Sequence, residues 1–326
     1  MRPDVSVIIP MHDAAATVER LVGSLLAIEP LAVEVVVVDD ASTDGSPDRV
    51  AALGRDEVVV ERFAVNRGAG IARNRGFELA TGRYTLFFDA DDEIHPAALA
   101  AAVGGLDETS ADLAFLPYRY RRGRAVHEGG PGGGHEGMNV FDLAAWSRYA
   151  TTPRRLTRLA AVPQLLGFSS YPWNKVLRTD HYRRRGLRFG GTPVHNDILG
   201  HWLTLLDADS ILLLDSPLCT HIVAAGGRNL TNRQSRARLS LVEALEETYT
   251  ALERRPEQRS RYAHHYWDFV LRVGGWATSR LTPDVVDEFN TRLQHHLLRM
   301  DLGDFARMRL RRDPLLADLV VRRTLA

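Results

Sequence analysis

The first hundred residues alternate between short, continuously apolar runs and stretches with helical spacing, and this alternation constrains the fold more than any other feature. Apolar runs without interleaved polar residues are typical of strands covered on both faces of a sheet. Strands are therefore expected at residues 5–9, 33–38, 58–60, 84–88 and 113–116. Helical spacing lies between them, at residues 18–25 and, less regularly, at 71–79. Together these patterns predict an α/β fold with a doubly wound, Rossmann-like mixed sheet.

The second half of the chain predicts a few more mixed elements and then only helices. Helices are expected at residues 141–149, 176–185 and 198–206, and strands at 210–214 and 218–223. Beyond Ser235 the apolar residues keep helical spacing to the C-terminus, which predicts a helical unit. The run Gly129–Gly134 is expected to be a flexible loop, and a domain boundary is expected near Gly226–Gln234.

Charge and cysteine content exclude several classes of protein. The 326 residues carry 41 basic and 41 acidic side chains, so a general nucleic-acid-binding surface is not expected. Cys219 is the only cysteine, which excludes an internal disulfide and a thiolate zinc cluster. No apolar run reaches the length of about 18 residues that spans a bilayer, and the N-terminus does not have the pattern of a signal peptide. A cytoplasmic location is therefore expected. Lys175 is the only lysine, which we interpret as a coding bias towards arginine.

Polar side chains collect where the predicted strands end. Pro10–Asp13 follows the first strand, Asp39–Asp44 the second and Asp89–Asp92 the fourth. In an open parallel sheet these ends share one edge, beyond which ligands bind. An acidic crevice repels phosphate unless a divalent cation lies between them, and hard cations favour carboxylate oxygens. The sequence therefore predicts Mg²⁺ or Mn²⁺ together with a diphosphate.

Several of these carboxylates also have a purely structural interpretation. Asp39 and Asp40 could close a turn, and Asp44 could cap the helix that follows. Asp92 is expected to cap the helix that begins near Pro96.

Asp89 and Asp91 are expected to act differently. In an extended segment their side chains point the same way, and the repulsion between them requires compensation. We therefore predict that they form a pair of metal ligands.

The segment Gly68–Arg73 has part of the glycine pattern of a dinucleotide-binding turn. Arg73 occupies the position where a small residue should pack against the sheet, and the segment follows the third strand rather than the first. A nicotinamide or flavin cofactor is therefore not expected. Arg73 is instead predicted to face phosphates or a base from the start of a helix.

Four blocks of sequence over residues 1–95 occur in a recognisable order and spacing. They are Val5–Pro10, Val37–Asp44, Asn66–Gly68 with Ala72–Asn74, and Phe88–Asp92; weaker matches follow at Trp173–Arg178, His195–Asp197 and Pro217–Asn229. These blocks resemble glycosyltransferase family 2, whose members have the GT-A fold. The resemblance implies a GT-A domain over residues 1–230, with a donor half at about 1–120 and an acceptor half at about 138–230. Residues 231–326 would form a separate helical domain.

The resemblance implies a site for a nucleotide sugar, with a uridine diphosphate sugar as the expected donor. Pro10 and His12 would hold the nucleoside, and Asp40 would accept a hydrogen bond from the uracil ring. Arg73 would lie beside the base or the phosphates. Asp91 would bind the metal on the diphosphate, and Asp89 would hold the ribose or share the metal.

The resemblance also implies a catalytic base at Asp197. A carboxylate on the face opposite the leaving group can take the proton of an acceptor hydroxyl, and a single displacement inverts the configuration of the sugar. The alternative for Asp197, which precedes an amphipathic helix, is an N-cap. The residue before the base is usually acidic in this family, whereas this chain has Asn196.

Three further residues have two interpretations each. Trp173 could be a platform for an acceptor sugar or a core tryptophan. His221 could be another metal ligand or a structural histidine. Arg228 could close over the diphosphate.

The sequence as a whole thus indicates an inverting, metal-dependent glycosyltransferase. Its acceptor would be a saccharide, a lipid-linked molecule or a small molecule. The C-terminal helices would serve acceptor binding, self-association or contact with the inner face of the membrane, because arginines surround apolar residues between Arg307 and Arg323. A solvated basic face is the simpler interpretation of those arginines. The alternatives are a catalytically silent nucleotide-binding scaffold protein and a polyprenyl-phosphate sugar synthase.

Overall fold

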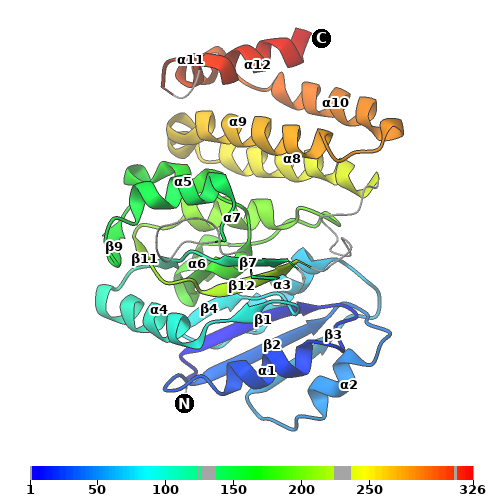
Figure 1. The fold of residues 1–326 in the computed structure, drawn as a ribbon, viewed down its shortest axis with the longest axis vertical. Helices are drawn as coiled ribbons and strands as arrows, with labels where there is room; N and C mark the ends of the chain where they lie inside the picture. The colour runs from blue at the N-terminus through cyan, green and yellow to red at the C-terminus, as the bar shows by residue number, and fades with distance from the viewer. Residues whose placement is uncertain (1, 123–124, 127–136, 224–235, 312–313, 326) are drawn as a thin grey trace.

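The computed structural model describes residues 2–122, 125–126, 137–223, 236–311 and 314–325. Its centre is an eight-stranded mixed sheet with the strand order β3-β2-β1-β4-β10-β6-β11-β9. A four-stranded sheet, in the order β5-β12-β7-β8, lies beside it. Helices α8 to α12 stack at one end of the molecule, farthest from β1 to β3 (Figure 1).

The N-terminal half forms the predicted alternation of strands and helices. Its elements are β1 (Val5–Met11), α1 (Val18–Leu26), β2 (Val33–Asp39), α2 (Ser46–Ala51), β3 (Val58–Arg62), α3 (Ala69–Leu79), β4 (Tyr84–Phe87), β5 (Glu93–Ile94) and α4 (Pro96–Thr109). Strands β1 to β4 pair in parallel. Helix α1 buries Val18, Leu21, Val22 and Leu25, whose spacing places them on one face.

The expectation that all these strands are covered on both faces is wrong for β3. Val59 and Val60 are 37% and 36% exposed, whereas every residue of β2 is buried. The reason is position, because β3 is the outermost strand on its side of the sheet. A run of valines does not reveal whether its strand is central or at an edge.

The second half continues the large sheet and builds the small one. Its elements are β6 (Leu113–Phe115), β7 (Arg119–Arg122), β8 (Ala125–Val126), α5 (Val140–Tyr149), β9 (Arg154–Thr157), β10 (Lys175–Arg178), α6 (Thr179–Arg185), α7 (Asp197–Leu206), β11 (Ile211–Leu214) and β12 (Cys219–Val223). Short 3₁₀ turns occur at η1 (Leu159–Ala161), η2 (Pro163–Gly167) and η3 (Pro172–Asn174). The predicted loop Gly129–Gly134 lies outside the described residues.

The helix expected at residues 176–185 is wrong in its first part. Residues Lys175–Arg178 form β10, and the helix α6 begins only at Thr179. Strand β10 runs antiparallel to both β4 and β6, and hydrogen bonds to each of them fix it in the middle of the sheet. Two consecutive apolar residues, Val176 and Leu177, fit a strand covered on both faces as well as they fit a helix.

The C-terminal part is helical, as predicted. After the short turn η5 (Arg236–Leu239) it consists of α8 (Ser240–Glu253), α9 (Pro256–Thr278), α10 (Pro283–Leu297), α11 (Leu302–Arg311) and α12 (Pro314–Leu325). These helices dock on the α/β part through contacts of α8 with α7 and of α9 with η2. The expected boundary near Gly226–Gln234 lies outside the described residues, so the division into domains stays a prediction.

Candidate active site

The strand ends that carry the predicted polar residues share one edge of the large sheet. Met11 pairs with Asp39 across β1 and β2, and Ile8 pairs with Phe87 across β1 and β4. The reversed strand β10 starts at this edge as well, since Lys175 pairs with Phe115 at the end of β6. Residues from both halves of the chain therefore meet where a ligand of an open α/β sheet binds.

Asp40 lies just after β2 and holds the loop that leads into α3. It is buried, and its two carboxylate oxygens accept the backbone N–H groups of Arg67 at 2.6 Å and Gly68 at 2.8 Å. A carboxylate can accept further hydrogen bonds beyond these. Its predicted contact with the uracil ring remains compatible with this geometry and stays a prediction.

The glycines after this loop allow α3 to approach the segment that precedes α7. Gly68 has a φ of +88°, which a residue with a Cβ atom rarely adopts. A Cβ atom on Gly70 would lie 2.0 Å from the carbonyl oxygen of Gly190 and 2.9 Å from the Cβ atom of Asn196. Close packing therefore accounts for Gly70, and the expectation that this segment is not a dinucleotide-binding turn stays a prediction.

The substitution Gly70→Ala should be strongly destabilising, because the added methyl group meets backbone atoms that cannot move aside. We expect the free energy of unfolding to fall by at least about 1–3 kcal/mol in urea titrations, the usual cost of overpacking. Gly104→Ala is the matched control, since Gly104 also lies in a helix but has open space around the position of a Cβ atom. That variant should be as stable as the wild type or slightly more so. Equal stability of the two variants would contradict the packing described here.

Arg73 bridges two segments of the site. Its guanidinium donates to Asp89 Oδ1 at 2.7 Å and to Asn196 Oδ1 at 2.8 Å, and it lies 5.4 Å from the centroid of the Phe189 ring. Arg73 is almost completely buried, whereas Asp89 is partly exposed. The end of β4 is thereby tied to the residue that precedes α7.

Asp91 and Asp92 have different surroundings, although they are adjacent. Asp91 is exposed, but partial loss of hydration and the neighbouring Asp89 carboxylate raise its pKa. Asp92 is buried and accepts hydrogen bonds from His221 Nδ1 at 2.9 Å and from the backbone N–H of Ile222 at 2.8 Å. The prediction that Asp92 caps α4 is wrong, because β5 lies between them and the N-cap position of α4 belongs to His95.

His221 is held in one orientation by its neighbours. Its ring centroid lies 5.5 Å from Tyr120, 5.3 Å from Tyr171 and 5.5 Å from Trp173. Burial opposes protonation, but the hydrogen bond to Asp92 and the charges around it raise the pKa of His221. Among the described residues, Nε2 has no hydrogen-bond partner. A histidine that binds a metal commonly donates its other N–H to a carboxylate, so this geometry fits ligation.

Trp173 has no exposed face. It is 0% exposed and stacks on the Tyr171 ring at a centroid distance of 4.4 Å and an interplanar angle of 12°. A ring that is enclosed on all sides cannot present a surface to an acceptor sugar. Its burial therefore favours the second interpretation, that of a core tryptophan.

Asp197 is the first residue of α7 and is only partly buried. Burial raises its pKa to about 6, although the positive charges of Arg73 and Lys175 oppose this shift. The N-cap position belongs to Asn196, whose amide oxygen serves Arg73 rather than the helix. Within the described residues no side chain donates a hydrogen bond to the Asp197 carboxylate. The interpretation of Asp197 as an N-cap is therefore wrong, and its predicted role as a base stays open to test.

Comparison with known proteins identifies the family of the N-terminal half. Residues 6–159 match the family model described as glycosyl transferase family 2. This segment belongs to glycosyl transferase family 2. The chain is 39% identical over 112 residues to the succinoglycan biosynthesis protein ExoO of Rhizobium meliloti (strain 1021), which is 34% of this chain and 32% of ExoO. It is 28% identical over 202 residues to the uncharacterized glycosyltransferase YibD of Escherichia coli (strain K12), which is 61% of this chain and 55% of YibD. The chain thus spans between a third and about half of these relatives' length.

Solved structures extend the similarity in fold to the whole chain. The crystal structure of S. aureus TarS 1-349 in complex with UDP-GlcNAc superposes with a TM-score of 0.73 at 20% identity, covering 98% of this chain and 89% of that one. The mannosyltransferase PcManGT from Pyrobaculum calidifontis, in complex with GDP-Man and Mn2+, gives a TM-score of 0.55 at 19% identity and covers 100% and 88%. The predicted GT-A fold with a helical C-terminal part is therefore confirmed.

Two other features of the protein lie at the opposite edge of the sheet. Asp112, His181 and Asp209 have potential ligand atoms within 4.8 Å of one another. Asp209 is paired with Arg185 at 3.1 Å, however, and His181 Nδ1 lies 3.3 Å from Asp112. Since Asp112 and Asp209 precede β6 and β11, this cluster is remote from the carboxylates that follow β2 and β4.

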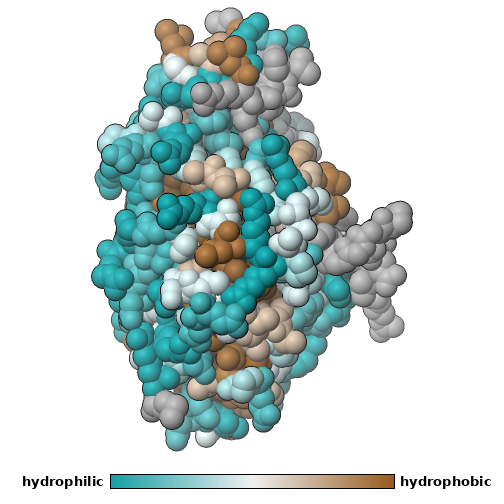
Figure 2. Space-filling model, turned by 90° about the vertical axis from the view of Figure 1, so that its left-hand side faces the viewer, coloured by the Kyte–Doolittle hydropathy of each residue, from teal (hydrophilic) through white to brown (hydrophobic). Residues whose placement is uncertain are grey.

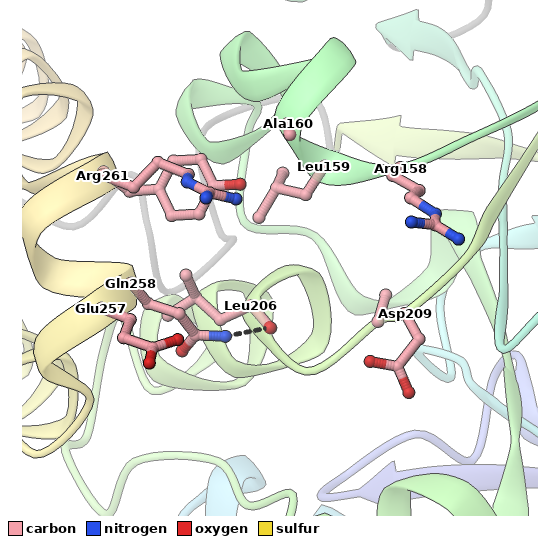
Figure 3. Close-up of a pocket in the computed structure, with 10 residues that line it drawn as sticks. Arg158, Leu159, Ala160, Leu206, Asp209, Glu257, Gln258 and Arg261 are labelled. Carbon is pink, nitrogen blue, oxygen red and sulfur yellow. Dashed lines mark hydrogen bonds between the residues drawn. The ribbon is translucent and has the colours of Figure 1, made fainter.

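A pocket of about 280 Å³ occupies the seam between this edge and the C-terminal helices (Figure 3). Leu159 from η1, Leu206 and Asp209 near the end of α7, and Gln258 and Arg261 from α9 line it. Gln258 donates a hydrogen bond to the backbone oxygen of Leu206, which ties α9 to α7. The pocket contains none of the strand-end carboxylates and is not part of the candidate active site.

Proposed function

We propose that this protein is an inverting glycosyltransferase that moves a sugar from a nucleotide diphosphate sugar to an acceptor hydroxyl. The observation that carries the proposal is the carboxylate cluster after β4, which is bonded to His221 through Asp92 and to the start of α7 through Arg73, in a chain whose residues 6–159 match the model of family 2. TarS bound to UDP-GlcNAc and PcManGT bound to GDP-Man support a nucleotide sugar as donor. A uridine diphosphate sugar is the first candidate.

The residues at the strand ends offer ligand types that a divalent cation prefers, but their ligand atoms do not lie within 4.8 Å of one another, as only those of Asp112, His181 and Asp209 do among the described residues. Asp91, Asp89 and His221 Nε2 would hold Mn²⁺ or Mg²⁺, because carboxylate oxygens and an oriented imidazole are suitable ligands. When bound, the cation would supply stabilisation of the negative charge that develops on the departing diphosphate. PcManGT was solved with Mn2+, which supports this choice of cation.

The remaining roles belong to residues around this cluster. Pro10 and His12, at and after the end of β1, and Asp40 would contact the nucleoside, and Arg73 would lie beside the base or phosphates. Arg228 is proposed to close over the diphosphate, although it lies outside the described residues. Asp197 would take the proton from the acceptor hydroxyl as the oxygen attacks the anomeric carbon.

The C-terminal helices carry features that suit an external contact. Leu302 and Leu310 of α11 are 87% and 84% exposed, and Figure 2 shows hydrophobic residues at the end of the molecule where these helices lie. Arg307 and Arg309 are paired with Asp304 and Asp318. No helix in the described residues combines the length and apolar composition needed to cross a membrane. We propose that α11 contacts the membrane surface or mediates self-association, which liposome sedimentation and light scattering would distinguish.

The function is tested with a panel of nucleotide sugars, each with Mn²⁺, with Mg²⁺ and with chelator. A bound donor stabilises the fold by RT ln(1 + [L]/Kd), so the preferred donor should raise the melting temperature most. The same donor should be hydrolysed slowly in the presence of metal. Metal-dependent binding without hydrolysis or transfer to any acceptor would instead indicate a silent nucleotide-binding scaffold.

Asp40→Ala should separate nucleotide recognition from loop structure. Removal of the buried acceptor leaves two backbone N–H groups without their partner, so unfolding should become easier by about 1–3 kcal/mol. UDP affinity, measured by calorimetry, should fall by a similar free energy if Asp40 also contacts the base. Normal UDP affinity in a destabilised variant would show that Asp40 only holds the loop.

A further inference from the structure

Residues 187–196, called the connecting segment below, join α6 to α7 and contain no helix or strand. The candidate base Asp197 follows directly at the start of α7. Connections without regular structure are usually more mobile than the elements they join. No side chain of the described residues donates a hydrogen bond to the Asp197 carboxylate. The position of this carboxylate therefore depends on what holds the connecting segment.

Asn74 of α3 holds the connecting segment by two hydrogen bonds to one residue. Its Oδ1 atom accepts the backbone N–H of Phe189 at 2.7 Å, and its Nδ2 atom donates to the backbone oxygen of Phe189 at 3.1 Å. The two residues are 115 positions apart in the sequence. The side-chain amide thus satisfies both backbone polar groups of Phe189, as a neighbouring strand would in a sheet.

Arg73, the preceding residue of α3, holds the end of the connecting segment. One terminal nitrogen donates to Asn196 Oδ1 at 2.8 Å, and the other donates to Asp89 Oδ1 at 2.7 Å. The backbone oxygen of Asn196 accepts the N–H of Gly190 at 2.8 Å, so the segment is also closed on itself. Helix α3 therefore fixes the segment at two separate points and links it to the carboxylates after β4.

Packing leaves the connecting segment little freedom on the side of α3. A Cβ atom on Gly70 would lie 2.0 Å from the backbone oxygen of Gly190. The Phe189 ring is buried and meets the Phe87 ring edge-on at a centroid distance of 4.7 Å. His195 has a φ of +64°, a conformation that costs free energy for a residue with a Cβ atom and persists where the surroundings impose it. The segment is thus held in one conformation almost to the start of α7.

We propose that Asn74 is a positioning residue for the transfer reaction, which holds Asp197 at a fixed distance from the carboxylates that follow β4. Asn74 fixes the connecting segment at Phe189, and Arg73 ties the end of the segment to the carboxylate side. The inference rests on the proposed role of Asp197 as the base. A base must lie within hydrogen-bond reach of the proton that it takes, so a small displacement of its segment lowers the rate.

Asn74→Ala should lower the rate without weakening donor binding. Loss of both hydrogen bonds lets the connecting segment move, and a misplacement of about 1 Å can cost about 10²-fold in rate. We expect the hydrolysis of the preferred uridine diphosphate sugar, measured with Mn²⁺ at saturating donor, to fall by at least about 10-fold. UDP affinity, measured by calorimetry with Mn²⁺, should match that of the wild type, because Asn74 contacts the segment of the base and not the donor side.

Hydrogen exchange measured by mass spectrometry gives a readout that needs no activity. In Asn74→Ala the Phe189 N–H loses its acceptor, so peptides that cover residues 187–197 should exchange faster than in the wild type. Peptides from β1, β2 and β4 should keep their protection. Unchanged exchange of residues 187–197, or equally faster exchange throughout the chain, would overturn the proposal.

The matched control is Arg183→Ala. Arg183 of α6 donates to the backbone oxygens of Phe77 at 2.8 Å and Ala80 at 2.7 Å, so this variant also loses two hydrogen bonds to α3, but at the C-terminal end of that helix. It should lower the melting temperature about as much as Asn74→Ala does and hydrolyse the donor at the wild-type rate. An equal loss of rate in both variants would mean that Asn74 contributes stability alone.

The double variant Asn74→Ala/Asp197→Asn tests whether Asn74 acts through Asp197. Residues that serve one step have non-additive effects, so Asn74→Ala should cause no further loss of rate in the Asp197→Asn background. Losses that multiply would overturn the proposal. A wild-type rate in Asp197→Asn alone would show that the base is wrong and the positioning role with it. A low rate in Asp197→Asn with a wild-type rate in Asn74→Ala would leave the base in place and refute the positioning role only.

Discussion

Asp197→Asn should abolish most of the sugar transfer while the fold and donor binding persist. An amide cannot accept the acceptor proton, so the rate should fall by about 10²–10⁴-fold, the usual contribution of a general base. The side chain accepts no hydrogen bond from another side chain among the described residues, and Asn196 rather than Asp197 occupies the cap, so the fold loses no contact. Asp209→Asn, which changes an exposed carboxylate at the opposite edge of the sheet, should transfer at the wild-type rate.

The same variant should show a characteristic dependence on pH. The pKa of Asp197 is about 6 in the folded protein and 3.8 without perturbation, so the folded state binds the proton more tightly than the unfolded state. The protonated Asp197 side chain therefore stabilises the fold below about pH 4, and this stabilisation is lost as the pH rises through 6. At pH 8 we expect Asp197→Asn to melt at or above the wild-type temperature, with the difference vanishing below pH 4. Wild-type transfer should rise with pH through about 6, where the base ionises.

Three measurements decide the role of Asp197: melting temperature, UDP affinity and transfer rate. Near wild-type transfer in Asp197→Asn would mean that another carboxylate is the base. Loss of UDP binding together with turnover would place Asp197 at the metal.

Asp91→Ala should remove the effect of metal on both binding and activity. Stabilisation of the departing diphosphate by a cation amounts to several kcal/mol, so transfer should fall by at least about 10²-fold. Wild-type UDP affinity should be higher with Mn²⁺ or Mg²⁺ than with chelator, whereas the affinity of Asp91→Ala should be low and equal in both. Calorimetry of UDP binding gives both comparisons.

The control for this experiment is Asp56→Ala, since Asp56 is an exposed carboxylate in the loop before β3 and far from the strand ends. It should retain the full effect of metal. Full activity of Asp91→Ala would show that no catalytic metal binds at this position. Equal UDP affinity of the wild type with and without chelator would show the same.

The sequence was sufficient to predict which residues gather at the strand ends. Each of these positions follows directly from a short apolar run, and parallel strands bring their ends to one edge. It was not sufficient to predict what each side chain contacts. Asp92 and His221 are separated by 129 positions and Arg73 and Asn196 by 123, so only the folded chain pairs them. A local pattern gave Asp92 the role of a helix cap, because nothing near it in sequence indicates a histidine partner.

Strand β10 was missed for a similar reason. Its four residues are too few for a periodic pattern, and their strand conformation depends on hydrogen bonds to β4 and β6, which lie far away in sequence. Lys175 had a signal in the sequence, since it is unique, but composition alone could not distinguish a bias from a function.

The reversed strand also determines how the molecule can move. Because β10 is hydrogen-bonded to β4 on one side and to β6 on the other, the parts proposed to bind donor and acceptor are joined by a continuous ladder. They cannot open and close about a hinge unless that ladder breaks, which is costly in the middle of a buried sheet. Any enclosure of the substrates must therefore come from loops and side chains at the rim. Side chains at that rim can therefore vary without moving the strand ends that carry Asp89 and Asp91.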